Sequence, residues 1–171
     1  MLEFSRIITY EGNDLDSLSR PFPLLLIFLR HFGCIFCREA LSDIADRREM
    51  IEKNNIKVVF VHMTEPSIAE DFFDEYELEG VEHIPDPETR LYRSFELKKA
   101  KFSQLFGLKV WARGYQLTKK SEHNLSLKQI GDNLQMPGVF LIHNGMIVKS
   151  FIHNSVSDRP DYDNFINYQP S

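Results

Sequence analysis

The chain contains only two cysteines, Cys34 and Cys37, and they stand three positions apart in the stretch FGCIFCRE. Such a pair can hold a metal, form a structural bridge or perform thiol–disulfide redox chemistry. A zinc site needs about four ligands, but the sequence has no second cysteine pair and no histidines at ligand spacing. A bridge this short closes a very small loop and removes little chain entropy. The pattern therefore favours redox chemistry, with two inert, packed thiols as the alternative.

The two cysteines lie at a predicted junction between a strand and a helix. Leu24–Leu29 is apolar at every position, which is typical of a strand buried on both faces. After Cys34, apolar residues recur at helical spacing as far as Ile51. Unpaired N–H groups at the start of a helix favour a thiolate, so Cys34 is the expected attacking thiol. Three basic residues that lie close in sequence could add to this effect: Arg30, His31 and Arg38. Cys37, one turn later on the buried face, should be less exposed, so the pair should consist of an exposed attacking thiol, Cys34, and a shielded resolving thiol, Cys37.

The order of the remaining elements predicts the fold class. Ile56–Met63 is a second buried strand, and strand, helix and strand form a βαβ unit with parallel strands. Asn144-Gly145 is a strong turn signal between two further strands, which predicts an antiparallel hairpin near the C-terminus. The sequence thus indicates an α/β fold with a mixed central β-sheet flanked by helices. A Cys-x-x-Cys beside a βαβ unit in a cytosolic chain points to a thioredoxin-like redox site. Other expected elements are a strand at Phe4–Tyr10 and helices that begin near Ser67, Arg90 and Asp161.

The length of 171 residues suits a single thioredoxin-like domain over residues 1–171. Residues 98–128 are a possible helical or loop insertion that is rich in lysine and aromatic residues. Its aromatic side chains could pack in the core, form a lid beside the dithiol or build a homodimer contact; they are Phe102, Phe106 and Trp111.

Composition excludes several classes of partner. The net charge of −5 at pH 7 argues against a nucleic-acid-binding protein, which would normally be basic. No apolar run is long enough to cross a membrane. The N-terminus lacks the basic and then apolar pattern of a signal peptide, so we expect a cytoplasmic protein whose thiols are kept mostly reduced.

Four motifs resemble those of the peroxiredoxin-like 2 group, the AhpC/TSA-type antioxidant proteins of the thioredoxin superfamily. They are FLRHFGCIFCREAL, DPETRLYRSFEL, GVFLIHNGMIVKSFIH and SDRPDYDNFI, and they run from about Leu24 to Ile166. The resemblance implies a thioredoxin fold and thiol-dependent reduction, with peroxides as the expected substrate class. It also implies that Cys34 is the attacking thiol and Cys37 its resolving partner.

The same resemblance points to residues beside the dithiol. In thioredoxin-like folds a cis-proline packs next to the dithiol and shapes the substrate groove, and Met136-Pro137 fits that place. An ordinary trans proline at the start of a strand is the alternative. Typical peroxiredoxins have Pro-x-x-x-Thr/Ser-x-x-Cys before the attacking cysteine, whereas this chain has Ile27 and His31 at those positions. The hydroxyl that would bind a peroxide oxygen is therefore missing.

Basic side chains are the candidates to replace that hydroxyl. His31 or Arg38 could bind the substrate, with Arg90 as a further candidate. Each has a structural alternative: His31 could cover the end of the strand, Arg38 could be a solvated surface residue, and Arg90 could pair with acidic residues of Glu77–Glu88.

These observations predict a thiol–disulfide oxidoreductase of peroxiredoxin-like type that reduces peroxides or protein disulfides. Cys34 and Cys37 are the expected catalytic residues, and the expected substrate-binding residues are Pro137, Met136, His31 and Arg38. No bound cofactor is needed, because an external thiol donor such as a thioredoxin or glutathione system would supply the electrons. The alternative is a non-enzymatic redox sensor or a thioredoxin-fold interaction module.

Overall fold

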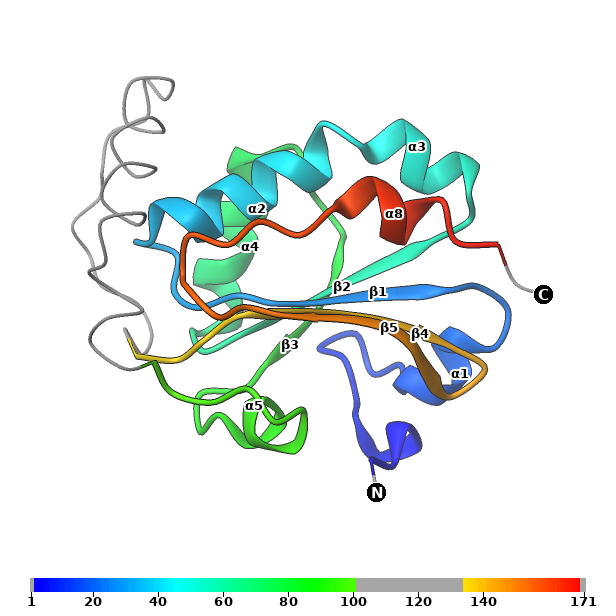
Figure 1. The fold of residues 1–171 in the computed structure, drawn as a ribbon, viewed down its shortest axis with the longest axis horizontal. Helices are drawn as coiled ribbons and strands as arrows, with labels where there is room; N and C mark the ends of the chain where they lie inside the picture. Colours follow the sequence, from blue (N-terminus) through cyan, green and yellow to red (C-terminus); the bar gives the residue numbers. More distant parts are fainter. Residues whose placement is uncertain (1, 101–133, 170–171) are drawn as a thin grey trace.

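The computed structural model describes residues 2–100 and 134–169. Their centre is a five-stranded sheet with the strand order β3-β2-β1-β4-β5 (Figure 1). The three strands β1, β2 and β3 are parallel, while β4 and β5 are each antiparallel to the preceding neighbour in the sheet. The strands are β1 Leu24–Phe28, β2 Lys57–His62, β3 Glu82–Pro85, β4 Gly138–His143 and β5 Met146–Ile152. The predicted mixed sheet of the α/β class is confirmed.

Helices cover both faces of the sheet (Figure 1). One face packs against α2 Ile35–Ala45, α3 Arg48–Lys53, α4 Pro66–Glu75 and α8 Tyr162–Ile166. The other face packs against the 3-10 helix η1 Phe4–Arg6, α1 Leu15–Ser19 and α5 Arg90–Ser94. Strand β1 lies in the middle, and all five of its residues are buried because alternate side chains enter the two cores.

The hairpin near the C-terminus forms as the sequence predicts. Asn144 and Gly145 connect β4 to β5, and both have positive φ angles, 51° and 68°. Such a two-residue turn matches the twist of paired strands and requires residues that tolerate this conformation.

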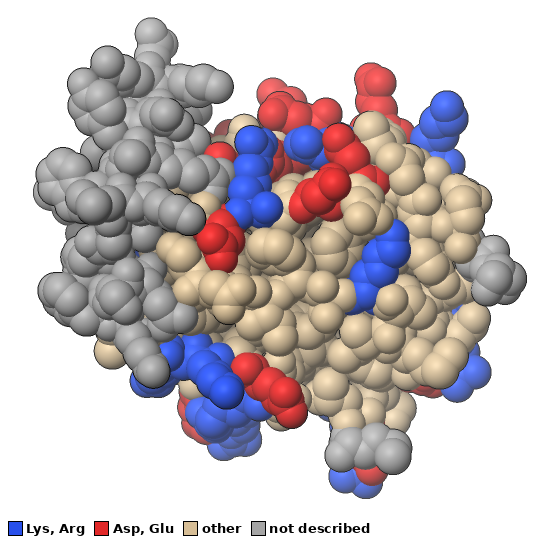
Figure 2. Space-filling view, viewed as in Figure 1, with Lys and Arg blue, Asp and Glu red and all other residues tan. Residues whose placement is uncertain are grey.

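Strand β5 is at the edge of the sheet and exposes three apolar side chains, Met146, Ile147 and Ile152. Uncharged residues dominate the middle of the molecular face shown in Figure 2.

Two expected elements differ from the structure. The predicted strand at Phe4–Tyr10 is wrong: this segment forms η1 and then a single bridge between Ile8 and Asp14, packed beside the sheet rather than in it. The helix predicted to continue to Ile51 breaks between α2 and α3. At the break, the backbone of Arg47 leaves helical geometry and its guanidinium donates a hydrogen bond to the carbonyl oxygen of Asp43 at 3.0 Å.

Two sequence predictions concern residues that lie wholly or partly outside the described ranges. Most of the predicted insertion at residues 98–128 lies outside the described residues, as do Phe102, Phe106 and Trp111. The extent of the domain over residues 1–171 thus stays a prediction. Within the described part of the chain, no helix is both long and apolar enough to span a membrane.

Candidate active site

The fold places Cys34 at the beginning of a helix. Strand β1 ends at Phe28, and after a short connection Cys34 is the N-cap residue of α2, with an extended backbone conformation. The carbonyl oxygen of Cys34 accepts hydrogen bonds from the backbone N–H groups of Cys37 at 3.0 Å and Arg38 at 3.1 Å, which start the helix. The sulfur of Cys34 therefore lies where unpaired N–H groups concentrate positive potential.

Both cysteines are free thiols and both are buried. Cys34 is 7% exposed and Cys37 is 4% exposed. The prediction of an exposed attacking thiol is therefore wrong, although Cys37 is the more shielded of the two. Both cysteines line a pocket whose other lining residues include several that are far along the sequence: His153, Val156, Asp158, Arg159 and Pro160.

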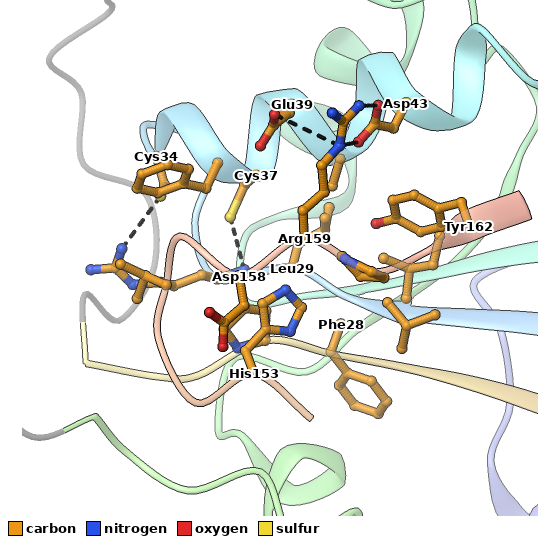
Figure 3. Close-up of a pocket in the computed structure, with 18 residues that line it drawn as sticks. Phe28, Leu29, Cys34, Cys37, Glu39, Asp43, His153, Asp158, Arg159 and Tyr162 are labelled. Atoms are coloured by element: carbon orange, nitrogen blue, oxygen red, sulfur yellow. Dashed lines mark hydrogen bonds and ion pairs between the residues drawn. The ribbon is translucent and has the colours of Figure 1, made fainter. Parts of the chain in front are cut away.

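One residue contacts both sulfurs (Figure 3). The guanidinium Nη1 of Arg30 lies 3.3 Å from the Sγ of Cys34, and the backbone N–H of Arg30 donates to the Sγ of Cys37 at 3.2 Å. The side chain of Arg30 thus places a positive charge beside one sulfur, while its main chain holds the other.

These contacts make the two thiols unequal. A hydrogen bond from the Cys37 thiol lowers the pKa of Cys34 to about 6, with help from the charge of Arg30 and from N–H groups at the helix start, against the opposing effect of burial. The same hydrogen bond raises the pKa of Cys37 well above its ordinary value, and burial adds to this. Near neutral pH, Cys34 is the thiolate and Cys37 keeps its proton.

The dithiol lines a small and mainly apolar pocket between α2, β4 and the C-terminal segment (Figure 3). The cavity volume of the pocket is about 30 Å³. One water needs about 10–15 Å³ by this measure, so the space suits a group of two heavy atoms. Residues that line it include Phe36, Pro137, Val139, His153, Val156 and Asp158.

Ion pairs fix the C-terminal wall to α2. Arg159 forms a two-pronged ion pair with Asp43, with its Nε at 2.8 Å from a carboxylate oxygen. It also lies 3.8 Å from Glu39. A second link joins Arg47 to Asp163 at 2.7 Å. Because Asp43 is buried, loss of Arg159 would deprive a buried carboxylate of an ion-pair partner.

The structure separates the four predicted substrate-binding residues. Pro137 lines the pocket, but its peptide bond to Met136 is trans, which corrects the expected cis-proline. Met136 is buried one residue away and packs against Val156 and Phe36 instead of lining the pocket. His31 accepts a hydrogen bond from the N–H of Cys34 through its carbonyl oxygen, while its ring is not part of the pocket wall.

Arg38 turns away from the sulfurs. Its Nε donates to the carbonyl oxygen of Phe32 at 3.1 Å, and its guanidinium lies over the ring of Phe72 and 3.8 Å from Glu75. The expectation of a solvated surface residue is also wrong, because Arg38 is buried between α2 and α4. Arg90 is exposed and pairs with Glu88 at 2.5 Å, as the structural alternative predicted.

Sequence reasoning named Arg30 only as one of three nearby basic residues that could favour the Cys34 thiolate, and it assigned no role to Arg159. Arg30 precedes Cys34 by four residues, but the connection between them is irregular, so spacing alone does not place its guanidinium. Among the described residues, no group of three or more His, Cys, Asp or Glu side chains is arranged to hold a metal ion.

Comparison with known proteins identifies the family. Residues 43–155 match the family described as AhpC/TSA antioxidant enzyme. The chain belongs to the AhpC/TSA antioxidant enzyme family. Membership of this family makes the protein a thiol-dependent oxidoreductase. The matched region begins after both cysteines, so the assignment of Cys34 and Cys37 depends on the geometry described above.

Individual relatives are distant in sequence. A chloroplastic thioredoxin-like protein of Arabidopsis thaliana is 23% identical over 97 residues, which cover 56% of this chain and only 39% of that protein. The prostamide/prostaglandin F synthase of Salmo salar is 24% identical over 154 residues, 88% of this chain and 76% of that protein.

Solved peroxiredoxin structures share the fold. A peroxiredoxin 6 mutant of Arenicola marina has a TM-score of 0.61 at 11% identity, covering 97% of this chain and 71% of that one. The peroxidoxin BcpB of Mycobacterium tuberculosis has a TM-score of 0.63 at 11% identity, covering 94% of this chain and 87% of that one. The thioredoxin-like fold predicted from the sequence is confirmed.

Proposed function

We propose that this AhpC/TSA family member reduces peroxides, with Cys34 as the attacking thiol and Cys37 as the resolving thiol. The observation that supports this most strongly is the inequality of the two sulfurs. Cys34 has the positive charge of Arg30 at 3.3 Å and the start of α2 beside it, whereas Cys37 keeps its proton in the interior.

In the first step the Cys34 thiolate attacks one oxygen of the peroxide. A sulfur–oxygen bond forms, the oxygen–oxygen bond breaks, and the leaving alkoxide or hydroxide takes up a proton. Cys34 becomes a sulfenic acid, and the peroxide is reduced by two electrons to an alcohol or water. Arg30 is positioned to stabilise the negative charge that moves to the leaving oxygen, in place of the absent Thr or Ser hydroxyl.

In the second step Cys37 loses its proton and attacks the sulfur of the Cys34 sulfenic acid. A disulfide forms, the sulfur–oxygen bond breaks, and the departing hydroxide leaves as water with the released proton. A dithiol donor, or two molecules of a monothiol, then reduces this disulfide and restores both thiols. Glutathione and thioredoxin systems have the required chemistry, and both take part in thiol resolution in a yeast mitochondrial peroxiredoxin that shares this fold.

Burial favours peroxides over protein disulfides as substrates. A protein disulfide must bring a bulky chain to the attacking sulfur, and Cys34 is only 7% exposed. The pocket beside it has space for a peroxide group, so the carbon chain of an organic peroxide would stay outside. Two relatives are named prostamide/prostaglandin F synthase, so lipid-like peroxides belong among the substrates to test. The reaction fits a reducing compartment such as the cytoplasm, and a homodimer stays a prediction.

Peroxide consumption by the full chain tests this function. Hydrogen peroxide and cumene hydroperoxide would be supplied with either a thioredoxin system or glutathione, and the Cys34–Cys37 disulfide followed by mass spectrometry. We expect turnover by the wild type, no turnover by Cys34→Ser, and a stable sulfenic acid or mixed disulfide in Cys37→Ser. Turnover by Cys34→Ser would refute the proposal. Formation of the disulfide without turnover with any donor would instead support a redox sensor.

A further inference from the structure

The segment Asp86–Leu97 is not used by the chemistry described so far, yet it is firmly anchored. The carboxylate of Asp86 accepts hydrogen bonds from the backbone N–H groups of Arg90 at 2.9 Å and Leu91 at 2.8 Å, at the start of α5. The N–H of Asp86 donates to the carbonyl oxygen of His62 at the end of β2. This buried carboxylate therefore fixes α5 against the end of the sheet.

That anchoring places one hydroxyl at the ends of two strands. Tyr92, in the middle of α5, is fully buried, and its hydroxyl donates to the carbonyl oxygen of Leu29 at 2.5 Å. The carbonyl oxygen of Val61 lies 3.1 Å from the same hydroxyl. Tyr92 thus joins the end of β1 to β2 at the point where the chain turns toward the dithiol.

The carbonyl of Leu29 and the N–H of Arg30 belong to the same peptide group. The carbonyl end accepts from Tyr92, and the N–H end donates to the Sγ of Cys37 at 3.2 Å. A hydrogen bond at one end of a peptide polarises it and strengthens the hydrogen bond at the other end. The phenol, the peptide and the sulfur therefore form a continuous chain of hydrogen bonds.

We propose that Tyr92 is a positioning residue that orients and polarises the Leu29–Arg30 peptide, so that its N–H stabilises Cys37 as a thiolate. The resolving role of Cys37 rests on the proposed function, but the effect of Tyr92 on the acidity of Cys37 does not. Charge must appear on this sulfur before it can attack, and the peptide N–H is already in place to receive it.

Other titratable groups near Cys37 act by different routes. Cys34 lies on the same helix start, and Tyr162 of α8 lines the same pocket. The guanidinium of Arg30 contacts Cys34 rather than Cys37. Tyr92 instead reaches Cys37 through the main chain, because its hydroxyl binds the carbonyl of the peptide whose N–H donates to that sulfur.

The first test measures the acidity of Cys37 without any catalysis. The rate of alkylation of Cys37 by iodoacetamide would be followed against pH in Cys34→Ser and in Cys34→Ser/Tyr92→Phe. Loss of the hydroxyl should move the midpoint upward by about half a pH unit, which is about a threefold loss of thiolate at a fixed lower pH. A change in accessibility alone would alter the plateau rate and leave the midpoint in place.

A control variant separates this effect from simple destabilisation. Phe95, the C-cap residue of α5, is buried and packs against Phe28 at a ring distance of 4.9 Å, but it has no hydroxyl. Phe95→Leu in the same Cys34→Ser background should lower stability and leave the midpoint of Cys37 unchanged. An unchanged midpoint in Tyr92→Phe, or an equal shift in Phe95→Leu, would overturn the inference.

The second test measures the resolving step. After a pulse of peroxide, Tyr92→Phe with both cysteines intact should convert the Cys34 sulfenic acid to the disulfide about threefold more slowly than the wild type, in line with its lower thiolate fraction. Unchanged conversion beside a shifted midpoint would refute the role in resolution. Absence of any disulfide in the wild type would instead count against the proposed function, while the alkylation midpoint would still decide the effect of Tyr92.

Discussion

Replacing Arg30 with glutamine should make Cys34 a weaker acid. The guanidinium lies 3.3 Å from the Sγ of Cys34, and its charge is one cause of the low pKa of about 6. At this separation, two unit charges interact by about 1.3 kcal/mol if screened as in water, and by about 5 kcal/mol at an effective dielectric constant of 20. We use the lower interaction energy, about 1.3 kcal/mol, because Arg30 is partly exposed to water. It corresponds to a rise of about one pH unit.

The assay follows from that shift. With a pKa near 6, about half of Cys34 is thiolate at pH 6, whereas with a pKa near 7 only about a tenth is. Alkylation of Cys34 at pH 6, read by mass spectrometry of its peptide, should therefore be about fivefold slower in Arg30→Gln than in the wild type. At pH 8 the alkylation rates of the wild type and Arg30→Gln should converge, because Cys34 is then mostly ionised in both proteins.

Two control variants test whether the effect depends on the charge of Arg30 and on its position beside Cys34. Arg30→Lys keeps the positive charge and should retain most of the effect. Arg38→Gln removes an equally charged residue that is close in sequence but contacts Phe32 and Glu75 rather than a sulfur, so the midpoint should hardly move. A midpoint near 6 in Arg30→Gln, or an equal shift in Arg38→Gln, would show that the guanidinium does not set the acidity of Cys34.

Three further predictions concern stability. Burial, together with the nearby His83, lowers the pKa of His62 to about 3, so between about pH 3 and 6.5 the unfolded chain binds a proton that the folded chain does not. The free energy of unfolding measured in urea should therefore fall as the pH drops below about 6.5, by on the order of 4 kcal/mol near pH 3. A His62→Gln variant whose stability falls equally steeply with pH would contradict this. Asp43→Asn should cost about 1.5–3 kcal/mol, because the buried carboxylate accepts from Arg159, whereas the exposed control Asp46→Asn should change urea stability by less than about 0.5 kcal/mol. Gly138→Ala should cost about 1–3 kcal/mol in the same assay, since an added Cβ would lie 2.6 Å from the buried side chain of Leu97; unchanged stability would mean that Leu97 moves freely.

The sequence predicts the elements that strong local patterns specify. Leu24–Phe28 is apolar throughout because both of its faces are covered, and the turn at Asn144-Gly145 needs two positive φ angles that these residues tolerate. The placement of Cys34 at a helix start follows from the change of pattern around it, from a continuous apolar run before it to apolar residues at helical spacing after it. Such features depend on a few neighbouring residues, so they can be read before the fold is known.

Contacts between distant segments were the part that the sequence could not provide. The pocket around the dithiol includes residues between 153 and 160, and the direction of Arg38 depends on Phe72 and Glu75 of α4. The predicted strand at Phe4–Tyr10 failed for the same reason, since apolar residues packed beside a sheet resemble those within one. Arg30 could be named as a candidate from its nearness to Cys34 in sequence, but not chosen over His31 and Arg38, because its contact with the sulfur depends on an irregular connection.

The C-terminal wall of the pocket also bears on how the protein is made. Asp43 and Arg159, which hold the wall to α2, are 116 positions apart in the chain. During synthesis, α2 therefore emerges from the ribosome long before the residues that shield its dithiol exist. Until then both thiols lack one side of the pocket that they line in the folded protein. The interval before the wall docks is thus the period in which this dithiol is most open to unwanted reactions, and docking of the wall ends it.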